Sequence, residues 1–179
     1  MALTIVDESP LGADLALLFQ RHTADMHADT PPESIHMMDA GQLAIPEVRF
    51  FVMRDHGMPV GVGAFKRIDD RHAEIKSMHV LAEVRGRGFS RRMLDHLTDE
   101  ARAAGYTRLS LETGVQPTFI AARALYAKAG FAECPPFEGY TDDPNSVFVT
   151  KPLCPTLVPP LQDCAFCRKR GARFRSSAG

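Results

Sequence analysis

The chain has almost no net charge, no long apolar run and no cysteine before residue 134. It has 21 lysine and arginine residues and 22 aspartate and glutamate residues, which gives a formal net charge of −1. The body of the protein therefore has no basic surplus for nucleic acid or for an anionic membrane surface. Because no apolar run approaches the roughly 18 residues of a membrane span, we expect neither a nucleic-acid nor a membrane partner.

The cysteines are confined to the last third of the chain, at Cys134, Cys154, Cys164 and Cys167. They are not distributed along the whole chain, as the disulfide-forming cysteines of a small secreted domain are, so we expect reduced thiols. Residues 1–10 lack the basic start and apolar segment of a secretory leader, which indicates a cytoplasmic protein. Cys164 and Cys167 have zinc-ligand spacing, but no second pair or nearby His-x-x-x-His follows, and we expect no metal.

The composition predicts one domain followed by a tail. With 179 residues, 45% hydrophobic and 24% charged, the chain can bury a single core. After Pro152 the character changes, because residues 161–179 carry five basic side chains against Asp163, a formal charge of +4, while the rest carries −5. We therefore predict a domain over residues 1–153 and a flexible, basic, cysteine-containing tail over residues 154–179.

The stretch from Ala73 to Leu97 reads as a strand, a glycine-rich turn and a helix. Apolar strand residues are followed by Arg85-Gly86-Arg87-Gly88, and apolar positions then recur at helical spacing. Such a turn directs several backbone N–H groups and the positive end of a helix at one place, and its glycines let a ligand approach closely. The pattern predicts a phosphate or pyrophosphate site. The alternative is an ordinary strand-to-helix turn with a solvated arginine face.

Periodicity and turn signals predict the other elements of an α/β chain. Strands are expected at residues 3–6, 48–54, 60–68, 72–81, 107–113, 131–134 and 147–151. Helices are expected at residues 13–28, from the glycine turn to Gly105, and from Pro117 to Gly130, with a short helix or turn at 37–43. The second to fourth strands form an antiparallel meander, and the helix after the glycine turn crosses over to a parallel neighbour.

Two motifs resemble the GNAT acetyltransferase superfamily. Arg85, Gly88 and Ser90 resemble the family's Arg-x-x-Gly-x-Gly/Ala pyrophosphate loop, although Ser90 replaces the last Gly or Ala. A serine hydroxyl there can cap the helix or contact a phosphate oxygen. Residues 125–131, Leu-Tyr-Ala-Lys-Ala-Gly-Phe, resemble the family's Leu-Tyr-x-Lys-x-Gly-Phe. The order of the expected elements is also that of the GNAT fold, over about residues 3–153.

The resemblance implies a mixed, mostly antiparallel sheet of about seven strands, flanked by about four helices and splayed at the acetyl-CoA site. It implies an N-acetyltransferase that uses acetyl-CoA as co-substrate and no metal. The acetyl group would move to a primary amine of a small molecule or peptide side chain, by direct attack in a ternary complex. A homodimer is one expected assembly. The alternative class is a non-catalytic acyl-CoA sensor or an interaction module that recruits a partner through its basic tail.

The resemblance also indicates which residues bind acetyl-CoA. They are the end of the strand and the following turn, namely Met78, His79, Val80, Arg85, Gly86, Arg87, Gly88, Phe89 and Ser90. GNAT strands splay at this point and leave main-chain groups unpaired, so a backbone N–H near Met78 to Val80 is expected to stabilise the oxyanion. The His79 side chain is expected to take no part.

Acetyl transfer to an amine requires an unprotonated nucleophile and a proton for the departing thiolate. Tyr126 matches the family tyrosine near the CoA sulfur and is the expected general acid, with a plain core aromatic as the alternative. Glu74 resembles the catalytic glutamate of some histone-modifying members and is the favoured base. The structural alternative for Glu74 is a salt bridge with Lys76, and Glu112 on the adjacent strand is the rival base.

The acceptor side is expected between the first helix and the second strand, because GNAT enzymes generally build it there. Glu33, Ser34 and His36 are the predicted substrate-binding residues, with a plain connector as the alternative. The far wall is expected from residues 30–43 and 136–145. Their acidic residues, Glu33, Glu138, Asp142 and Asp143, favour a cationic acceptor unless they are merely solvated loop charges.

Overall fold

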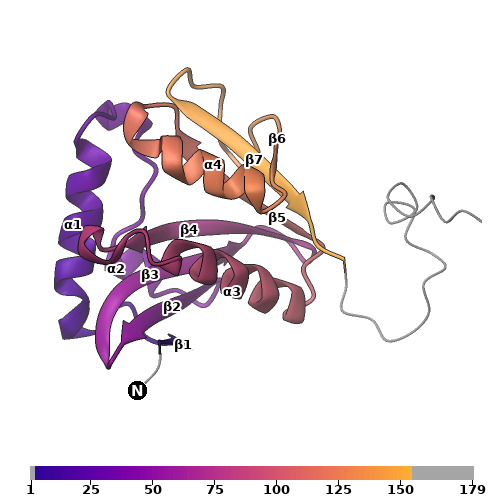
Figure 1. Ribbon diagram of the computed structural model, residues 1–179. Coiled ribbons are helices and arrows are strands. Elements are labelled where there is room, and N and C mark those ends of the chain that lie inside the picture. The colour runs from indigo at the N-terminus through magenta and orange to yellow at the C-terminus, as the bar shows by residue number, and fades with distance from the viewer. Residues whose placement is uncertain (1–2, 155–179) are drawn as a thin grey trace, which may run out of the picture.

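The computed structural model describes residues 3–154, which form an open seven-stranded sheet with helices on both faces (Figure 1). The strands are β1 (Thr4–Asp7), β2 (Val48–Asp55), β3 (Met58–Arg67), β4 (His72–Val80), β5 (Arg108–Gly114), β6 (Ala132–Glu133) and β7 (Ser146–Pro152). The helices are α1 (Ala16–His27), α2 (Ala40–Leu43), α3 (Phe89–Ala103) and α4 (Ile120–Lys128). Short 3-10 turns lie at Ala13–Leu15, Pro32–Ser34, Ala82–Val84 and Pro117–Phe119. The predicted tail lies almost wholly outside the described residues.

The strand order is β1-β2-β3-β4-β5-β7-β6. As predicted, β2, β3 and β4 form an antiparallel meander, and α3 crosses over to β5, which runs parallel to β4. The last strand, β7, then inserts between β5 and the two-residue β6, antiparallel to both. This mixed, mostly antiparallel sheet confirms the predicted fold class.

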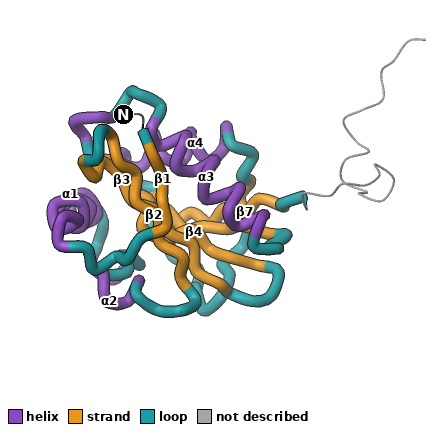
Figure 2. Tube along the Cα trace, turned by 90° about the horizontal axis from the view of Figure 1, so that it is seen from below, coloured by secondary structure: helices purple, strands orange, loops and turns teal. Residues whose placement is uncertain are grey.

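Helices cover both faces of the sheet (Figure 2), and an apolar core lies on each face. Strand β2 supplies both, because Phe51 and Met53 pack with residues of α3 and α4 while Phe50 and Val52 pack with residues of α1 and α2. This alternation follows from the two-residue repeat of a strand. Within residues 3–154, no helix combines the length and the apolar character needed to cross a membrane.

Helix α3 packs closely on β3 because Gly63 carries no side chain at the contact. A Cβ at Gly63 would lie 3.0 Å from Leu97 Cδ1 and 3.1 Å from Met93 Cγ, which is too tight without movement. Leu97 and Met93 are both fully buried. The close approach fixes α3 on the sheet and thereby fixes the place of its N-terminus, which begins directly after the glycine turn.

Strands β4 and β5 pair only at their first residues. The pairing joins His72–Glu74 to Arg108–Ser110 and then stops. Just beyond, Ser77 has a φ of 52°, and the register between β3 and β4 shifts, as expected for a β-bulge. From there β4 and β5 diverge, so backbone groups of both strands face an opening between them.

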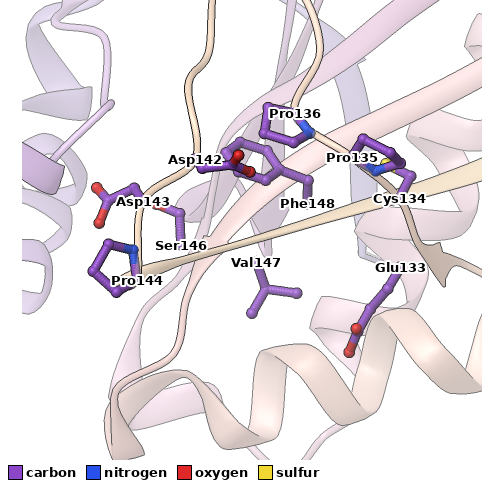
Figure 3. Close-up of a pocket in the computed structure, with 10 residues that line it drawn as sticks. All are labelled: Glu133, Cys134, Pro135, Pro136, Asp142, Asp143, Pro144, Ser146, Val147 and Phe148. Atoms are coloured by element: carbon purple, nitrogen blue, oxygen red, sulfur yellow. The ribbon is translucent and has the colours of Figure 1, made fainter.

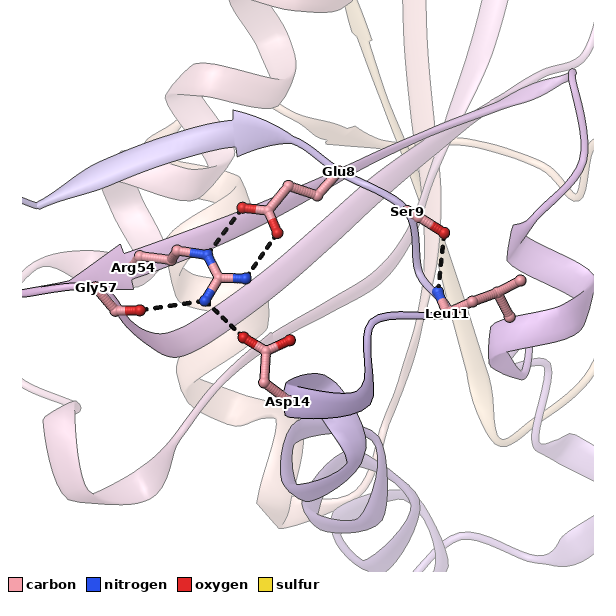
Figure 4. Close-up of polar contacts among 6 residues, drawn as sticks. All are labelled: Glu8, Ser9, Leu11, Asp14, Arg54 and Gly57. Carbon is pink, nitrogen blue, oxygen red and sulfur yellow. Dashed lines mark hydrogen bonds and ion pairs between the residues drawn. The ribbon is translucent and has the colours of Figure 1, made fainter.

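Arg54 joins the N-terminal segment to the hairpin between β2 and β3 (Figure 4). Its Nε and Nη2 donate to the two carboxylate oxygens of Glu8 at 2.8 and 2.7 Å. Its Nη1 donates to Asp14 at 2.7 Å and to the carbonyl oxygen of Gly57 at 3.2 Å. A bidentate arginine pair of this kind fixes both distance and orientation, and it holds the start of α1 against the sheet.

Candidate active site

The turn before α3 presents unpaired N–H groups. Gly86 and Gly88 have φ angles of 80° and 77°, and a Cβ on either would meet nothing within 4 Å. Gly88 immediately precedes α3, whose N-terminus has no side-chain cap. Among the described residues, the backbone N–H groups of residues 86–91 have no hydrogen-bond acceptor. Open space in front of free N–H groups at a helix N-terminus suits a phosphate group.

Ser90 does not cap α3. The N-cap position is held by Gly88, and no side chain bonds to the first turn. The capping role considered for the Ser90 hydroxyl is therefore wrong, because the helix begins one residue before it. A contact between this hydroxyl and a phosphate oxygen stays a prediction.

The two arginines of the turn are held by partners elsewhere in the fold. Arg85 Nε donates to the carbonyl oxygen of Val80 at 3.2 Å, and its Nη2 contacts Asp25 on α1 at 2.7 Å. Arg87 Nη1 pairs with Asp55 at the end of β2 at 2.9 Å. These contacts fix the turn from both sides, so the arginines order the backbone that faces the opening.

His79 on β4 stacks on His22 of α1, with ring centroids 5.1 Å apart. Both residues are only 7% exposed, and His22 Nδ1 and His79 Nε2 have no hydrogen-bond partner. Burial lowers the pKa of each imidazole to about 4, against the opposing charge of Asp25. The pair is therefore neutral near pH 7 and packs α1 onto the end of β4.

Glu74 and Lys76 project from β4 on the face opposite α4, because they alternate with residues of the core under α3 and α4. Glu74 is 3% exposed. Its Oε1 lies 2.8 Å from Lys76 Nζ and accepts a hydrogen bond from the Tyr140 hydroxyl at 2.6 Å. Lys76 Nζ also donates to that hydroxyl. The salt bridge with Lys76 that we considered for Glu74 is thus present.

Glu112 lies on the same face, on β5 beyond the last residue paired with β4. It is half-buried, and its Oε1 accepts a hydrogen bond from the Ser146 hydroxyl at 2.7 Å. Burial raises the pKa of Glu112, and the Ser146 bond and the Lys76 charge offset this only in part. A carboxylate with a raised pKa is suited to accept a proton near neutral pH.

Tyr126 approaches the opening from the other face. It lies on α4, is 7% exposed and packs edge-on against Phe131 with centroids 6.0 Å apart. Burial and the charge of Glu112 raise its pKa, so the phenol keeps its proton at neutral pH. Tyr126 and Glu112 thus come from opposite faces of the sheet, yet lie close enough for the carboxylate charge to act on the phenol.

The predicted acceptor wall is assembled from two distant segments. Asn145 Nδ2 donates to Ser34 Oγ at 3.2 Å, and the His36 ring packs edge-on against Tyr140 at 5.0 Å. Ser34 is buried and His36 half-buried, whereas Glu33 is exposed to solvent. The structure therefore brings Ser34 and His36 to the loop between β6 and β7, and leaves Glu33 outside these contacts.

Beside this wall a hollow of about 410 Å³ opens between β6, β7 and their connecting loop. It is lined by Glu133, Cys134, Pro135, Pro136, Asp142, Asp143, Pro144, Ser146, Val147 and Phe148. Figure 3 shows Val147 and Glu133 on one side of β7, and Phe148 and Asp142 on the other. Two of the predicted acidic residues, Asp142 and Asp143, belong to this lining, and Glu33 and Glu138 do not.

Sequence reasoning named the loop but missed two side chains that bind the candidate carboxylates, Tyr140 in the loop and Ser146 at the start of β7. Tyr140 binds Glu74 and Lys76, and Ser146 binds Glu112. The only sequence signal for Tyr140 was its place, with Phe137, as one of two aromatic residues in an otherwise polar loop. For metals, no group of three or more His, Cys, Asp or Glu side chains in the described part of the chain is arranged to hold an ion. Cys164 and Cys167 lie outside that part.

Comparison with known proteins identifies the family. The model of the acetyltransferase (GNAT) family matches residues 17–131. The uncharacterized N-acetyltransferase YsnE of Bacillus subtilis is 43% identical over 142 residues, covering 79% of this chain and 94% of its own. The chain belongs to the GNAT family of acetyltransferases. The IAA acetyltransferase of Azospirillum brasilense is 45% identical over 157 residues, covering 84% of this GNAT chain and 98% of its own.

Solved structures agree with this GNAT assignment. An acyl-CoA N-acyltransferase from Klebsiella pneumoniae superposes with a TM-score of 0.69 and 29% identity, covering 85% of this chain and 98% of its own. A GNAT acetyltransferase from Elizabethkingia anophelis, solved with acetyl-CoA bound, superposes with a TM-score of 0.61 and 19% identity. The match covers 84% of this chain and 98% of that one. The predicted fold and enzyme class are confirmed. The protein is an acyltransferase of a family that uses acetyl-CoA.

The buried histidine pair predicts a loss of stability in acid. Each imidazole has a pKa of about 4 when folded and an ordinary value of 6.5. Between those values the unfolded chain binds more protons, so the free energy of unfolding falls as the pH falls through this window. We expect a loss of roughly a few kcal/mol between about pH 7 and pH 4, measured by urea unfolding.

His22→Phe removes one of the two titrating groups and should flatten this pH dependence. His27→Gln, on the exposed end of α1, is the matched control and should leave it as in the wild type. An unchanged slope in His22→Phe would contradict the assignment.

Proposed function

We propose that this protein is an acetyl-CoA-dependent N-acetyltransferase. It moves the acetyl group to a primary amine of a small molecule or an amine-bearing side chain, by direct attack in a ternary complex. The observation that carries this proposal is the opening between β4 and β5. The free N–H groups of residues 86–91 lie at one end of it, Tyr126 acts from one face, and Glu74 and Glu112 lie on the other.

The residues present fit acetyl-CoA, which supplies the activated acetyl thioester. The turn from Arg85 to Ser90 offers free N–H groups and the positive end of α3 to the pyrophosphate. The part of β4 that is unpaired toward β5 includes Met78, His79 and Val80. Its backbone groups are available to the pantetheine arm and, through an N–H, to the oxyanion.

The side chains around the opening divide the proton transfers between them. Tyr126 keeps its proton at neutral pH and gives it to the departing thiolate. A carboxylate on the opposite face, Glu74 or Glu112, takes a proton from the acceptor amine. Tyr126 thus protonates the thiolate, while a different group, the carboxylate, deprotonates the amine before it attacks.

The acceptor enters from the face that carries Ser34, His36 and the loop between β6 and β7. The carboxylates of Asp142 and Asp143 in the neighbouring hollow support a cationic amine. One relative is named an IAA acetyltransferase, so IAA belongs in the same acceptor screen as polyamines, amino acids and lysine peptides.

The first prediction concerns acetyl-CoA binding. Gly88→Asp places a Cβ and a negative charge where the N–H groups face the pyrophosphate, at a φ of 77° that L-residues rarely adopt. We expect affinity for acetyl-CoA to fall roughly 100-fold or more, measured by calorimetry. Gly105→Asp, with a φ of 94° at the other end of α3, should bind as the wild type does. If the wild-type protein bound ATP but showed no affinity for acetyl-CoA, the proposed acetyl-CoA site would be refuted.

The second prediction concerns the proton donor. Tyr126→Phe removes a hydroxyl used in the transition state, so we expect kcat to fall about 100-fold with the KM for acetyl-CoA little changed. CoA thiol release is the measurement. Tyr106→Phe, which alters a ring packed on Phe65 away from the opening, is the control and should keep full turnover. An unchanged rate in Tyr126→Phe would remove Tyr126 from the mechanism.

The acceptor screen gives a third expectation. A polyamine or a lysine peptide should release CoA thiol faster than an acidic amino acid, because the rim is negative. The rate should drop with added salt and in Asp142→Asn, since salt screens exposed charges. A preference for an anionic acceptor would count against the acidic rim.

A further inference from the structure

The two carboxylates near the opening differ in the charge of their partners. Glu74 contacts the Lys76 ammonium at 2.8 Å, and their side chains are 4% and 13% exposed. It also accepts a hydrogen bond from Tyr140 at 2.6 Å. Glu112 is hydrogen-bonded to the neutral hydroxyl of Ser146 at 2.7 Å. One carboxylate is paired with a cation in a buried site, and the other is held by a hydroxyl.

This difference decides which group can take a proton without breaking a buried ion pair. A carboxylate that takes a proton loses its attraction to a neighbouring cation. Breaking a buried ion pair also leaves an uncompensated charge, which is costly. Glu74 would therefore have to give up the stabilisation from Lys76 to act as the base, whereas Glu112 makes no direct ion pair with Lys76.

Tyr140 connects this pairing to the acceptor loop. Its ring packs against Phe137 and Phe148 with centroids 5.4 and 5.2 Å away, and Lys76 Nζ lies 5.0 Å from its centroid. The His36 ring meets it edge-on from the opposite segment. This aromatic packing holds the Tyr140 hydroxyl over Glu74, so the loop and the ion pair keep each other in place.

We propose that Lys76 and Tyr140 are positioning residues that hold Glu74 as a paired carboxylate and leave Glu112 as the base of acetyl transfer. The proposal rests on the N-acetyltransferase function proposed above. The acceptor ammonium gives one proton to Glu112, and its nitrogen forms the bond to the acetyl carbon as the C–S bond breaks. The thiolate takes the Tyr126 proton. The second proton lost by the nitrogen restores Tyr126, and the proton on Glu112 passes to solvent.

The charge of Lys76 then sets the pH at which Glu112 works. The charged and titratable groups that face Glu112 come from β4, the segment before α2, the acceptor loop and α4: Glu74, Lys76, His36, Tyr140 and Tyr126. Lys76 supplies the positive charge of the ion pair with Glu74. Without it, the negative charges of Glu74 and Glu112 oppose each other, and Glu112 keeps its proton to higher pH.

The test is the carboxyl titration of Glu112 in the full-length protein, followed by NMR with carbon-13-labelled glutamate and assigned with Glu112→Gln. We expect Lys76→Met to raise the midpoint of Glu112 by about one pH unit or more. Lys76→Arg keeps the positive charge, so its Glu112 midpoint should stay within a few tenths of a pH unit of the wild-type midpoint. The double variant Glu74→Gln, Lys76→Met removes both charges and should return the midpoint close to the wild-type value.

Turnover with acetyl-CoA and spermidine gives the second readout. Glu112→Gln should lower kcat about 100-fold, while the double variant should keep kcat within about tenfold of the wild type. Tyr140→Phe keeps the ion pair but frees the loop, so the KM for spermidine should rise several-fold with kcat little changed.

Three results would overturn the proposal: an unmoved Glu112 midpoint in Lys76→Met, equal shifts in Lys76→Met and Lys76→Arg, or a double variant as inactive as Glu112→Gln. Because the titration needs neither acetyl-CoA nor an acceptor, it is informative by itself. A shifted midpoint in a protein that turns over no amine would support the charge assignment and reject the transferase function.

Discussion

The separation of β4 from β5 is the constraint on which the other features depend. Parallel pairing stops at Glu74 and Ser110, and the bulge at Ser77 turns β4 away. A sheet normally satisfies its backbone groups through neighbouring strands, so an opening inside it leaves such groups for a ligand. It also lets side chains from the two faces act on one point. Tyr126 on α4 and Glu112 on the opposite face of the sheet lie close enough for the Glu112 charge to raise the Tyr126 pKa.

Around this opening, most polar side chains hold the protein's own structure. Arg85 binds the end of β4 and Asp25, Arg87 binds Asp55, and Glu74 binds Lys76. The groups without such ties are the backbone N–H groups of the glycine turn and the unpaired edge of β4. The side-chain contacts therefore hold in place backbone groups that have no hydrogen-bond partner of their own, which is the arrangement that preorganised anion and oxyanion sites require.

Local sequence predicted the parts of the site that depend on local geometry. The glycine turn was predictable because its positive φ angles and the helix start depend on neighbouring residues, and a short motif was enough to single out Tyr126 as a candidate. Strand limits also came within about two residues. The contacts of Tyr140 with Lys76 and Glu74 were not predictable. These residues precede Tyr140 by 64 and 66 positions in the sequence, and the aromatic packing that holds Tyr140 has no periodic signal. Lateral strand order likewise escaped, because hydrophobic alternation shows that β7 is a strand without showing that it lies between β5 and β6.

The place of β7 has a consequence for synthesis of the chain. Strand β5 has its pairing partner on that side only in Ser146–Pro152, near the end of the described residues. Until this segment leaves the ribosome, β5 presents an exposed edge, and Glu112 lacks the hydroxyl of Ser146. The meander from β1 to β4, which carries Glu74, consists of sequence neighbours and can form earlier, whereas the half of the sheet that carries Glu112 closes last. An emerging chain thus passes through a stage in which its unpaired strand needs protection from other strands.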